Sequence, residues 1–197
     1  MALPRKGPDG LAIKPFKTQD AWLAWLDGKH ASEKGIWIRY YKKATGKPTI
    51  DYQSTLDVAL CYGWIDGQGK GEGAETHIQR WVPRAKRSMW SKRNVARALE
   101  LIEEGRMQPA GLAEIERAKA DGRWDAAYDA PSTAKPSPEL EAALKKNKKA
   151  AAAFAKLDSR NRFAILNRIQ TAKRDETKTK RIKEFVAMLA RGEKVYP

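Results

Sequence analysis

The chain has 197 residues, with 39 lysines and arginines against 24 aspartates and glutamates, which gives a formal net charge of +15. That length allows one or two domains, and 42% hydrophobic with 32% charged residues excludes a chain that is disordered throughout. The single Cys61 excludes an internal disulfide and a zinc site built from cysteines, and two histidines leave little for a histidine-rich metal site. We therefore expect no metal and no cofactor.

The chain shows no sign of a membrane segment. No apolar run approaches the roughly 18 residues that a helix needs to cross a bilayer. Residues 1–10 carry basic side chains with no apolar stretch behind them, which does not match a signal peptide. We expect a cytoplasmic protein that is not an integral membrane protein.

The first elements mix strands and helices. Residues 11–16 predict a short strand, and Thr18 is a helix cap before an apolar face that ends near Gly28. Residues 36–41 are β-branched and aromatic, which predicts the clearest strand of the chain. A helix is expected from Asp51 to about residue 60, with Gly63 where a glycine commonly follows a helix end.

Two further strands are expected at residues 64–66 and 76–82, joined by a flexible hairpin loop over Gly67–Gly73. The glycine spacing in this loop matches a dinucleotide fingerprint, but that motif must open a helix and the next segment alternates like a strand. The segment does not match the Walker-type phosphate-binding loop either, because that motif requires serine or threonine after its lysine and Lys70 is followed by Gly71. A mobile hairpin loop is the favoured interpretation.

The rest of the chain is expected to be helical. One helix follows Ser91 with its apolar face on Val95, Ala98, Leu99 and Ile102, and another begins at Pro109. Later helices are capped by Ser137 and by Asp158 or Ser159. The fold class is therefore α+β: a small antiparallel sheet with helices, then an all-helical part. We divide the chain into a domain at 1–130, a proline-rich linker at 131–138 and a basic helical region at 139–197.

The positive charge is distributed unevenly. Residues 1–50 hold 10 basic and 4 acidic side chains, residues 51–130 hold 12 and 13, and residues 131–197 hold 17 and 7. All seven tryptophans precede residue 125. Most of the excess charge and most of the aromatic chemistry thus lie in different parts of the chain.

Residues 80–93 carry the densest chemistry, with six basic residues and two tryptophans in fourteen positions. Arginine binds carboxylates and phosphates bidentately, and indoles stack on bases or cations. A basic, tryptophan-lined groove for an anionic ligand or an acidic protein would consist of Trp64, Asp66, Arg84, Trp90, Ser91 and Asn94. The alternative is a buried aromatic core beside a solvated basic loop.

Two other features have weaker functional interpretations. Cys61 and His77 resemble a nucleophile and a base, but a helix C-terminus disfavours a thiolate, so a buried structural cysteine is favoured. The C-terminal cations offer a contact surface for a nucleic acid or another anion, with the polar face of amphipathic helices as the alternative. The residues concerned are Lys173, Arg174, Lys178, Lys180 and Arg181.

Several ordered blocks resemble one bacterial family. The stretch Ala59–Gly67 is similar to the signature of the YdeI-like or OmpD-associated (bacteriocin-protection) proteins. The resemblance covers roughly residues 15 to 192, with further matching blocks at Pro83-Arg84 and residues 90–94, 105–107, 118–124, 172–173, 176–178 and 180–182. Lys178, where an arginine is expected, and the additional glycines of residues 67–73 depart from the pattern. The resemblance implies a mixed α/β part followed by a helical part, and it supplies no established enzymatic reaction or cofactor.

Three functions remain in competition. The leading hypothesis is a non-enzymatic binding or stress-protection protein that uses the groove. The second is a nucleic-acid-associated protein, bound nonspecifically through the basic C-terminal helices. The third is an enzyme with Asp66 as acid or base, although the sequence supplies no catalytic partner for that carboxylate at a defined spacing.

Overall fold

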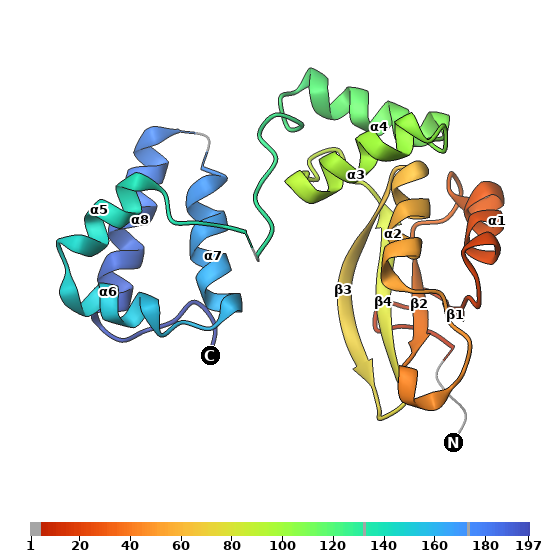
Figure 1. Ribbon diagram of the computed structural model, residues 1–197, viewed down its shortest axis with the longest axis horizontal. Coiled ribbons are helices and arrows are strands. Elements are labelled where there is room, and N and C mark those ends of the chain that lie inside the picture. The colour runs from red at the N-terminus through yellow and green to blue at the C-terminus, as the bar shows by residue number, and fades with distance from the viewer. Residues whose placement is uncertain (1–4, 132, 173) are drawn as a thin grey trace. The chain divides into compact units, whose positions relative to one another are not determined.

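The structure is a computed structural model that describes residues 5–131, 133–172 and 174–197. It confirms the α+β class, with a four-stranded sheet and helices first and helices after it (Figure 1). The chain forms two compact units. The N-terminal unit comprises residues 5–88 and 94–125, and the C-terminal unit comprises residues 89–93 and the described residues from 126 onward. The expected division at residues 130 and 139 stays a prediction.

The sheet has the strand order β1-β2-β4-β3. Its strands are β1 (Ile13–Pro15), β2 (Ile36–Tyr41), β3 (Trp64–Glu72) and β4 (Thr76–Pro83). The pairs β2–β4 and β3–β4 are antiparallel, as predicted, whereas β1 pairs parallel to β2. The parallel pair requires the crossover through α1, which a sequence pattern alone does not reveal.

The glycine-rich segment is part of a strand, so its prediction as a flexible loop is wrong. Strand β3 continues to Glu72, and its pairing with β4 shifts between Asp66 and Gly69. The side-chain amide of Gln79 donates to the carbonyl of Gly67 at 2.6 Å beside this bulge. Gly73, with φ of 78°, lies in the turn that follows. Glycine is rare in strands, but a bulge is one of the places where it occurs.

The N-terminal unit contains α1 (Gln19–Lys29), α2 (Tyr52–Cys61), all but the first two residues of α3 (Lys92–Glu103), and α4 (Pro109–Ala120), with a short 3-10 helix at Lys43–Thr45. The predicted caps are confirmed at two of them. The Thr18 hydroxyl accepts from the Ala21 amide, and the Asp51 carboxylate accepts from the Ser54 amide. Each side chain thereby satisfies an amide that has no partner within its helix.

The main core lies between α1, α2 and one face of the sheet. Trp22, Trp64 and Trp81 are at most 1% exposed. The rings of Trp22 and Trp64 meet edge-on, with centroids 6.3 Å apart. The buried indole N–H groups all have acceptors here: Trp22 donates to the Thr55 carbonyl, Trp64 to a backbone carbonyl and Trp81 to the Tyr40 hydroxyl. Aromatic pairs of this kind each add about 0.5–1.5 kcal/mol beyond their buried area.

The opposite face of the sheet holds a smaller cluster around Ile13, Trp37 and Ile78. The indole of Trp37 donates to the Asp9 carboxylate at 2.7 Å, which ties the N-terminal segment to this face. Beside it, Arg39 on β2 forms a bidentate ion pair with Glu72 on β3. This face therefore carries a small apolar cluster and a buried ion pair.

The C-terminal unit contains α5 (Pro138–Lys145), α6 (Lys148–Ala155), α7 (Ser159–Gln170) and α8 (Asp175–Ala190). Ser137 and Asp158 cap α5 and α7 as predicted, and Asn147 caps α6. Apolar side chains from all four helices form one core, with Leu140, Ile165 and Leu189 at most 1% exposed. Even α8, the longest of the described helices, is too short and too polar to span a membrane, and the others among the described residues are as well.

Candidate functional site

The predicted groove residues of the N-terminal unit occupy different environments. Trp64 is buried, and its indole N–H donates to the His30 carbonyl at 3.2 Å, so it belongs to the core. The Asp66 carboxylate accepts from the Tyr52 hydroxyl at 3.0 Å. Arg84 is 5% exposed, which is unusual for a residue with a permanent charge.

The other predicted groove residues lie near the boundary between the units in the sequence. Trp90 is 1% exposed, and Ser91 forms an isolated bridge with Tyr128, both within the C-terminal unit. Asn94 is a half-buried residue of α3 in the N-terminal unit. The groove as a complete set therefore stays a prediction.

Arg84 lies within a cluster of charged residues that the sequence did not indicate. Arg117, on α4, forms an ion pair with Glu114 and also donates to the Arg84 and Ala85 carbonyls at 3.4 and 3.5 Å. The positive charges of Arg117, Arg84 and Arg123 all act on the carboxyl group of Glu114. We call Arg84, Arg117, Arg123 and Glu114 the arginine cluster.

Arg123 anchors the loop that leads into this cluster. Its Nη1 donates to the Ser88 carbonyl at 2.6 Å, and its Nε lies 2.8 Å from each carboxylate oxygen of Asp121. Arg123 is only 6% exposed. The loop itself closes through the Ser88 hydroxyl, which accepts from the Ala85 amide at 3.1 Å.

Local backbone geometry places the cluster. The Arg84 amide donates to the Gly63 carbonyl at 2.9 Å, which fixes the end of β4 beside the end of α2. Helix α4 approaches the same place because Gly111 lacks a side chain where a Cβ would lie 2.3 Å from the Cys61 carbonyl oxygen. After α4, Gly122 has φ of 74° and turns the chain so that Arg123 follows directly.

Hydrogen bonding within the arginine cluster is incomplete among the described residues. The Nε of Arg117 and the Nη2 of Arg123 are buried and have no hydrogen-bond acceptor among the residues that the structure describes. Burial raises the pKa of Glu114, although Arg117, Arg84 and Arg123 act to lower it. Buried charged donors without acceptors are costly, so the arrangement favours an additional negatively charged group.

Cys61 is a buried structural residue, as the sequence favoured. It is 4% exposed, and burial raises the pKa of its thiol to about 11. A thiol with such a pKa is almost entirely protonated at neutral pH and is a poor nucleophile. His77 stacks on Tyr40 with ring centroids 5.1 Å apart, and burial lowers its pKa.

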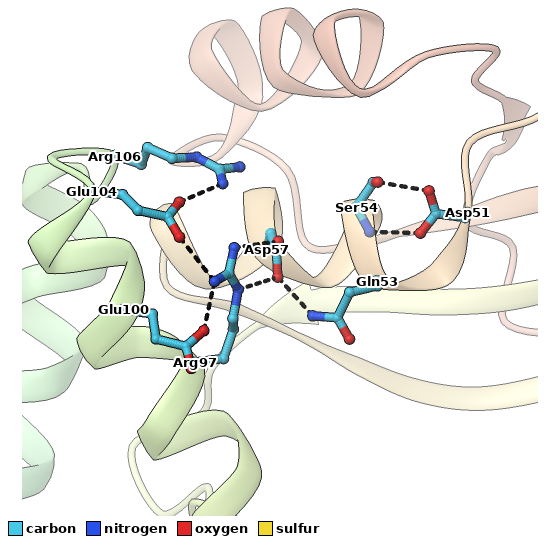
Figure 2. A network of polar contacts seen from close by, with 8 residues as sticks. All are labelled: Asp51, Gln53, Ser54, Asp57, Arg97, Glu100, Glu104 and Arg106. Atoms are coloured by element: carbon cyan, nitrogen blue, oxygen red, sulfur yellow. Dashed lines mark hydrogen bonds and ion pairs between the residues drawn. The ribbon is translucent and has the colours of Figure 1, made fainter.

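A second polar network joins α2 to α3 (Figure 2). Arg97 donates to both Asp57 oxygens at 2.9 and 2.8 Å and also to Glu100 and Glu104, and Glu104 in turn accepts from Arg106. In this network, each of the two arginines and each of the three carboxylates forms at least one ion pair with an opposite charge. We interpret the network as a structural link between the two helices.

The C-terminal cations predicted to contact an anion are placed as follows. Lys173 lies outside the described residues, and Arg174 directly precedes α8. Lys178 forms an ion pair with Glu139 at 2.6 Å, and Lys180 lies 4.0 Å from Glu184. Arg181 donates to the backbone carbonyl of Arg168. Lys178 and Lys180 each have an acidic neighbour, and the predicted contact surface stays a prediction.

No group of three or more histidine, cysteine, aspartate or glutamate side chains is placed to hold a metal ion within residues 5–131, 133–172 and 174–197. Carboxylates of the described residues instead form ion pairs with arginines and lysines, as in Arg39–Glu72, Arg97–Asp57 and Lys178–Glu139.

Comparison with known families divides the chain into two parts. Residues 14–114 match the model of a family described as a domain of unknown function, DUF8412. The chain belongs to this family. Residues 133–192 match a second model, described as bacteriocin-protection, YdeI or OmpD-associated. The predicted resemblance to that second family is thus shown for residues 133–192, whereas the Ala59–Gly67 block lies in the DUF8412 part. No curated protein matched the chain, and no solved structure did either.

Proposed function

We propose that the N-terminal unit is a non-enzymatic binding module for a small oxyanion, such as phosphate, or for a carboxylate of an acidic protein. Arg117 and Arg123 hold the anionic group next to Arg84. The proposal keeps Arg84 from the groove expected from the sequence and adds two arginines from α4 and the turn behind it. A cytoplasmic location remains the expectation from the sequence.

One observation carries this proposal. Two guanidinium nitrogens, the Nε of Arg117 and the Nη2 of Arg123, are buried without an acceptor among the described residues. Guanidinium groups bind carboxylates and phosphates through two parallel hydrogen bonds. A hydrogen bond to a charged group contributes about 1.5–3 kcal/mol, so removing one donor should weaken binding about tenfold to a hundredfold.

Binding of inorganic phosphate to the full chain tests the proposal. Titration calorimetry at low ionic strength should show binding to the wild-type protein, and Arg123→Gln should weaken it at least tenfold. Arg117→Lys keeps the charge but loses the two-pronged geometry, so we expect it to weaken binding as well. The matched control is Arg87→Gln, which removes one exposed positive charge from the same loop.

Circular dichroism establishes whether each variant is folded. Because Arg123 also holds the Ser88 carbonyl, Arg117→Lys supplies a second variant that leaves that contact in place. Equal phosphate affinity in wild-type protein and in folded Arg117→Lys and Arg123→Gln would refute the site. An absence of phosphate and acetate binding to the wild-type protein would refute it too.

The match of residues 133–192 to a bacteriocin-protection model bears on the role of such binding. We infer that the protein contributes to protection by binding a ligand or an acidic partner, without a chemical reaction. The hypothesis that Asp66 acts as an acid or base has less support, because the hydrogen-bond partner of its carboxylate is the hydroxyl group of Tyr52.

A further inference from the structure

The C-terminal unit contains an open pocket of about 440 Å³. One wall is the face of α7 that carries Arg160, Phe163, Ala164, Asn167 and Arg168. Successive residues in each of two rows, 160-163-167 and 160-164-168, are three or four positions apart, as on one side of a helix. Pro131 and Tyr196 also line the pocket. The volume falls within the usual range of small-molecule sites.

The Tyr196 wall is held in place by a buried asparagine. Asn161 is 1% exposed, and its side-chain oxygen accepts from the Tyr196 amide at 2.8 Å. Its amide nitrogen donates to the Tyr196 carbonyl at 3.3 Å. One side chain thus fixes both the backbone N–H and the backbone carbonyl of Tyr196. Because Tyr196 is already ordered, ligand binding does not carry the entropy cost of ordering it.

The pocket is positively charged. The guanidinium carbons of Arg160 and Arg168 lie 4.3 and 6.0 Å from the centre of the Tyr196 ring. Neither arginine forms an ion pair within the described part of the chain, and no lining residue is acidic. Arg181 donates a hydrogen bond to the Arg168 carbonyl, which places a third guanidinium group near the C-terminal end of α7.

A carboxylate near the other end of the pocket is already occupied. Asp158 caps α7 and accepts from the backbone and side-chain nitrogens of Asn161 at 2.7 and 3.0 Å. Its hydrogen bonds point into the helix end, and these bonds lower its pKa. Asp158 therefore positions Asn161, which in turn holds Tyr196. Its carboxylate does not pair with Arg160 or Arg168, so these two arginines are available for a ligand.

The pocket also offers flat and hydrogen-bonding surfaces. Phe163 and Tyr196 present aromatic rings, and guanidinium planes stack on flat rings as well. The side-chain oxygen of Asn167 is buried and has no hydrogen-bond partner among the described residues. An asparagine amide provides both donor and acceptor, which suits the edge of a heteroaromatic base.

We propose that this pocket binds a mononucleotide: a phosphate on the guanidinium groups of Arg160 and Arg168, a base against the aromatic walls and its edge on Asn167. Either a free mononucleotide or one nucleotide of a strand would supply this chemistry, and we assign the free mononucleotide. The open pocket has a volume of small-molecule size, and its two lining arginines suffice for one phosphate. The site is independent of the arginine cluster, which belongs to the other unit.

Binding of AMP to the full chain, measured by titration calorimetry at low ionic strength, tests the inference. We expect adenosine and inorganic phosphate each to bind at this site at least ten times more weakly than AMP, because each lacks half of the contacts. Arg160→Gln with Arg168→Gln should weaken AMP binding at least tenfold. Arg162→Gln, which removes a charge from α7 outside the pocket lining, should leave it within about twofold.

A measurement on the wild-type protein does not depend on the folding of any variant. Nuclear Overhauser contacts should join the base protons of AMP to the ring protons of Tyr196 and Phe163. An absence of AMP binding, the same AMP affinity in the folded double variant, or base contacts to other aromatic residues would each overturn the site. Tighter binding of a phosphorylated trinucleotide than of AMP would overturn the assignment of a free mononucleotide. Arg123→Gln, which removes a donor from the arginine cluster, should leave the contacts of the AMP base with Tyr196 and Phe163 unchanged, so a failure of one proposal is distinguishable from a failure of the other.

Discussion

Among single residues, Gly111 shows how closely the backbone of α4 approaches α2. A Cβ at this position would lie 2.3 Å from the carbonyl oxygen of Cys61 and 2.8 Å from that of Leu60. Both contacts are backbone atoms, which cannot move aside as a flexible side chain does. This approach also brings Glu114 and Arg117, about one and two turns further along α4, into the arginine cluster.

Gly111→Ala is therefore expected to lower the free energy of unfolding by about 1–3 kcal/mol, the usual cost of overpacking. The matched control is Gly28→Ala in α1, where a Cβ would have no atom within 4 Å. Because alanine favours helix, this control should raise stability by up to about 1 kcal/mol. Urea unfolding followed by tryptophan fluorescence measures both, and equal stability of Gly111→Ala and wild type would contradict the packing argument.

Local residue signals were predictable from the sequence, and long-range partners were not. The caps at Thr18, Asp51 and Ser137 follow from residue type and position, since a cap bonds within three residues of itself. Arg84 was indicated by the density of charge around it. Its neighbour Arg117 lies 33 residues further along the chain, and no periodic pattern connects positions at that separation.

At the scale of elements, the Arg39–Glu72 ion pair connects β2 to β3 across β4. Its side chains are 8% and 12% exposed. The hydrogen bond from Arg39 is the largest cause that lowers the pKa of Glu72, followed by burial, which acts in the opposite direction. A carboxyl group with a lowered folded-state pKa stabilises the fold above its unfolded-state pKa, and this stabilisation is lost as the pH falls through the folded-state value.

Glu72→Gln should consequently lower stability at pH 7 by about 3–5 kcal/mol, because it leaves a buried arginine without its counter-charge. Below pH 4.5, the ordinary pKa of glutamate, the variant should lose stability less steeply than wild type. Glu75→Gln is the control, since its ion pair with Lys47 is exposed and contributes about 1 kcal/mol or less. Parallel pH profiles of Glu72→Gln and wild type in urea unfolding would contradict the role of the pair.

The elements themselves were largely predictable where one face is apolar, and less so elsewhere. Strand β2 was predicted over residues 36–41, which are its bounds in the structure. The sequence predicts only residues 64–66 of β3, because the glycines that follow are typical of a loop. Their pairing with β4 shows that they belong to the strand. In α3 the predicted face included Leu99 and Ile102, yet these are 46% and 37% exposed while Leu101 is buried. Helical spacing defines a face, but tertiary packing decides which one is buried.

At the scale of the whole molecule, the net charge is concentrated away from the arginine cluster. Residues 131–197 contain 17 basic and 7 acidic residues. Part of this charge is balanced locally, as in the pair of Lys178 and Glu139. Where α5 meets α6, four exposed lysines lie within five residues: Lys145, Lys146, Lys148 and Lys149. Such a concentration produces a positive field that attracts any polyanion.

We therefore expect the full chain to bind duplex DNA weakly and without sequence preference, with the α5–α6 lysines as main contacts. Each phosphate contact contributes about −0.9 to the slope of log K against log salt concentration. Replacing the four lysines by glutamine should make that slope shallower by up to about 3.6 if all four contact phosphates. The control replaces four exposed lysines of the N-terminal unit and changes the net charge equally: Lys17, Lys29, Lys34 and Lys43.

Fluorescence anisotropy of a labelled duplex, titrated at several salt concentrations, distinguishes a local contact from a general charge effect. If the α5–α6 lysines contact the phosphates, their replacement changes the slope and the control changes it little. If the two variants lower the slope equally, the attraction comes from net charge alone and no surface on α5–α6 is involved. A wild-type protein that does not bind at low salt would exclude the contact altogether, and the basic residues of this unit would then serve as solvated helix faces.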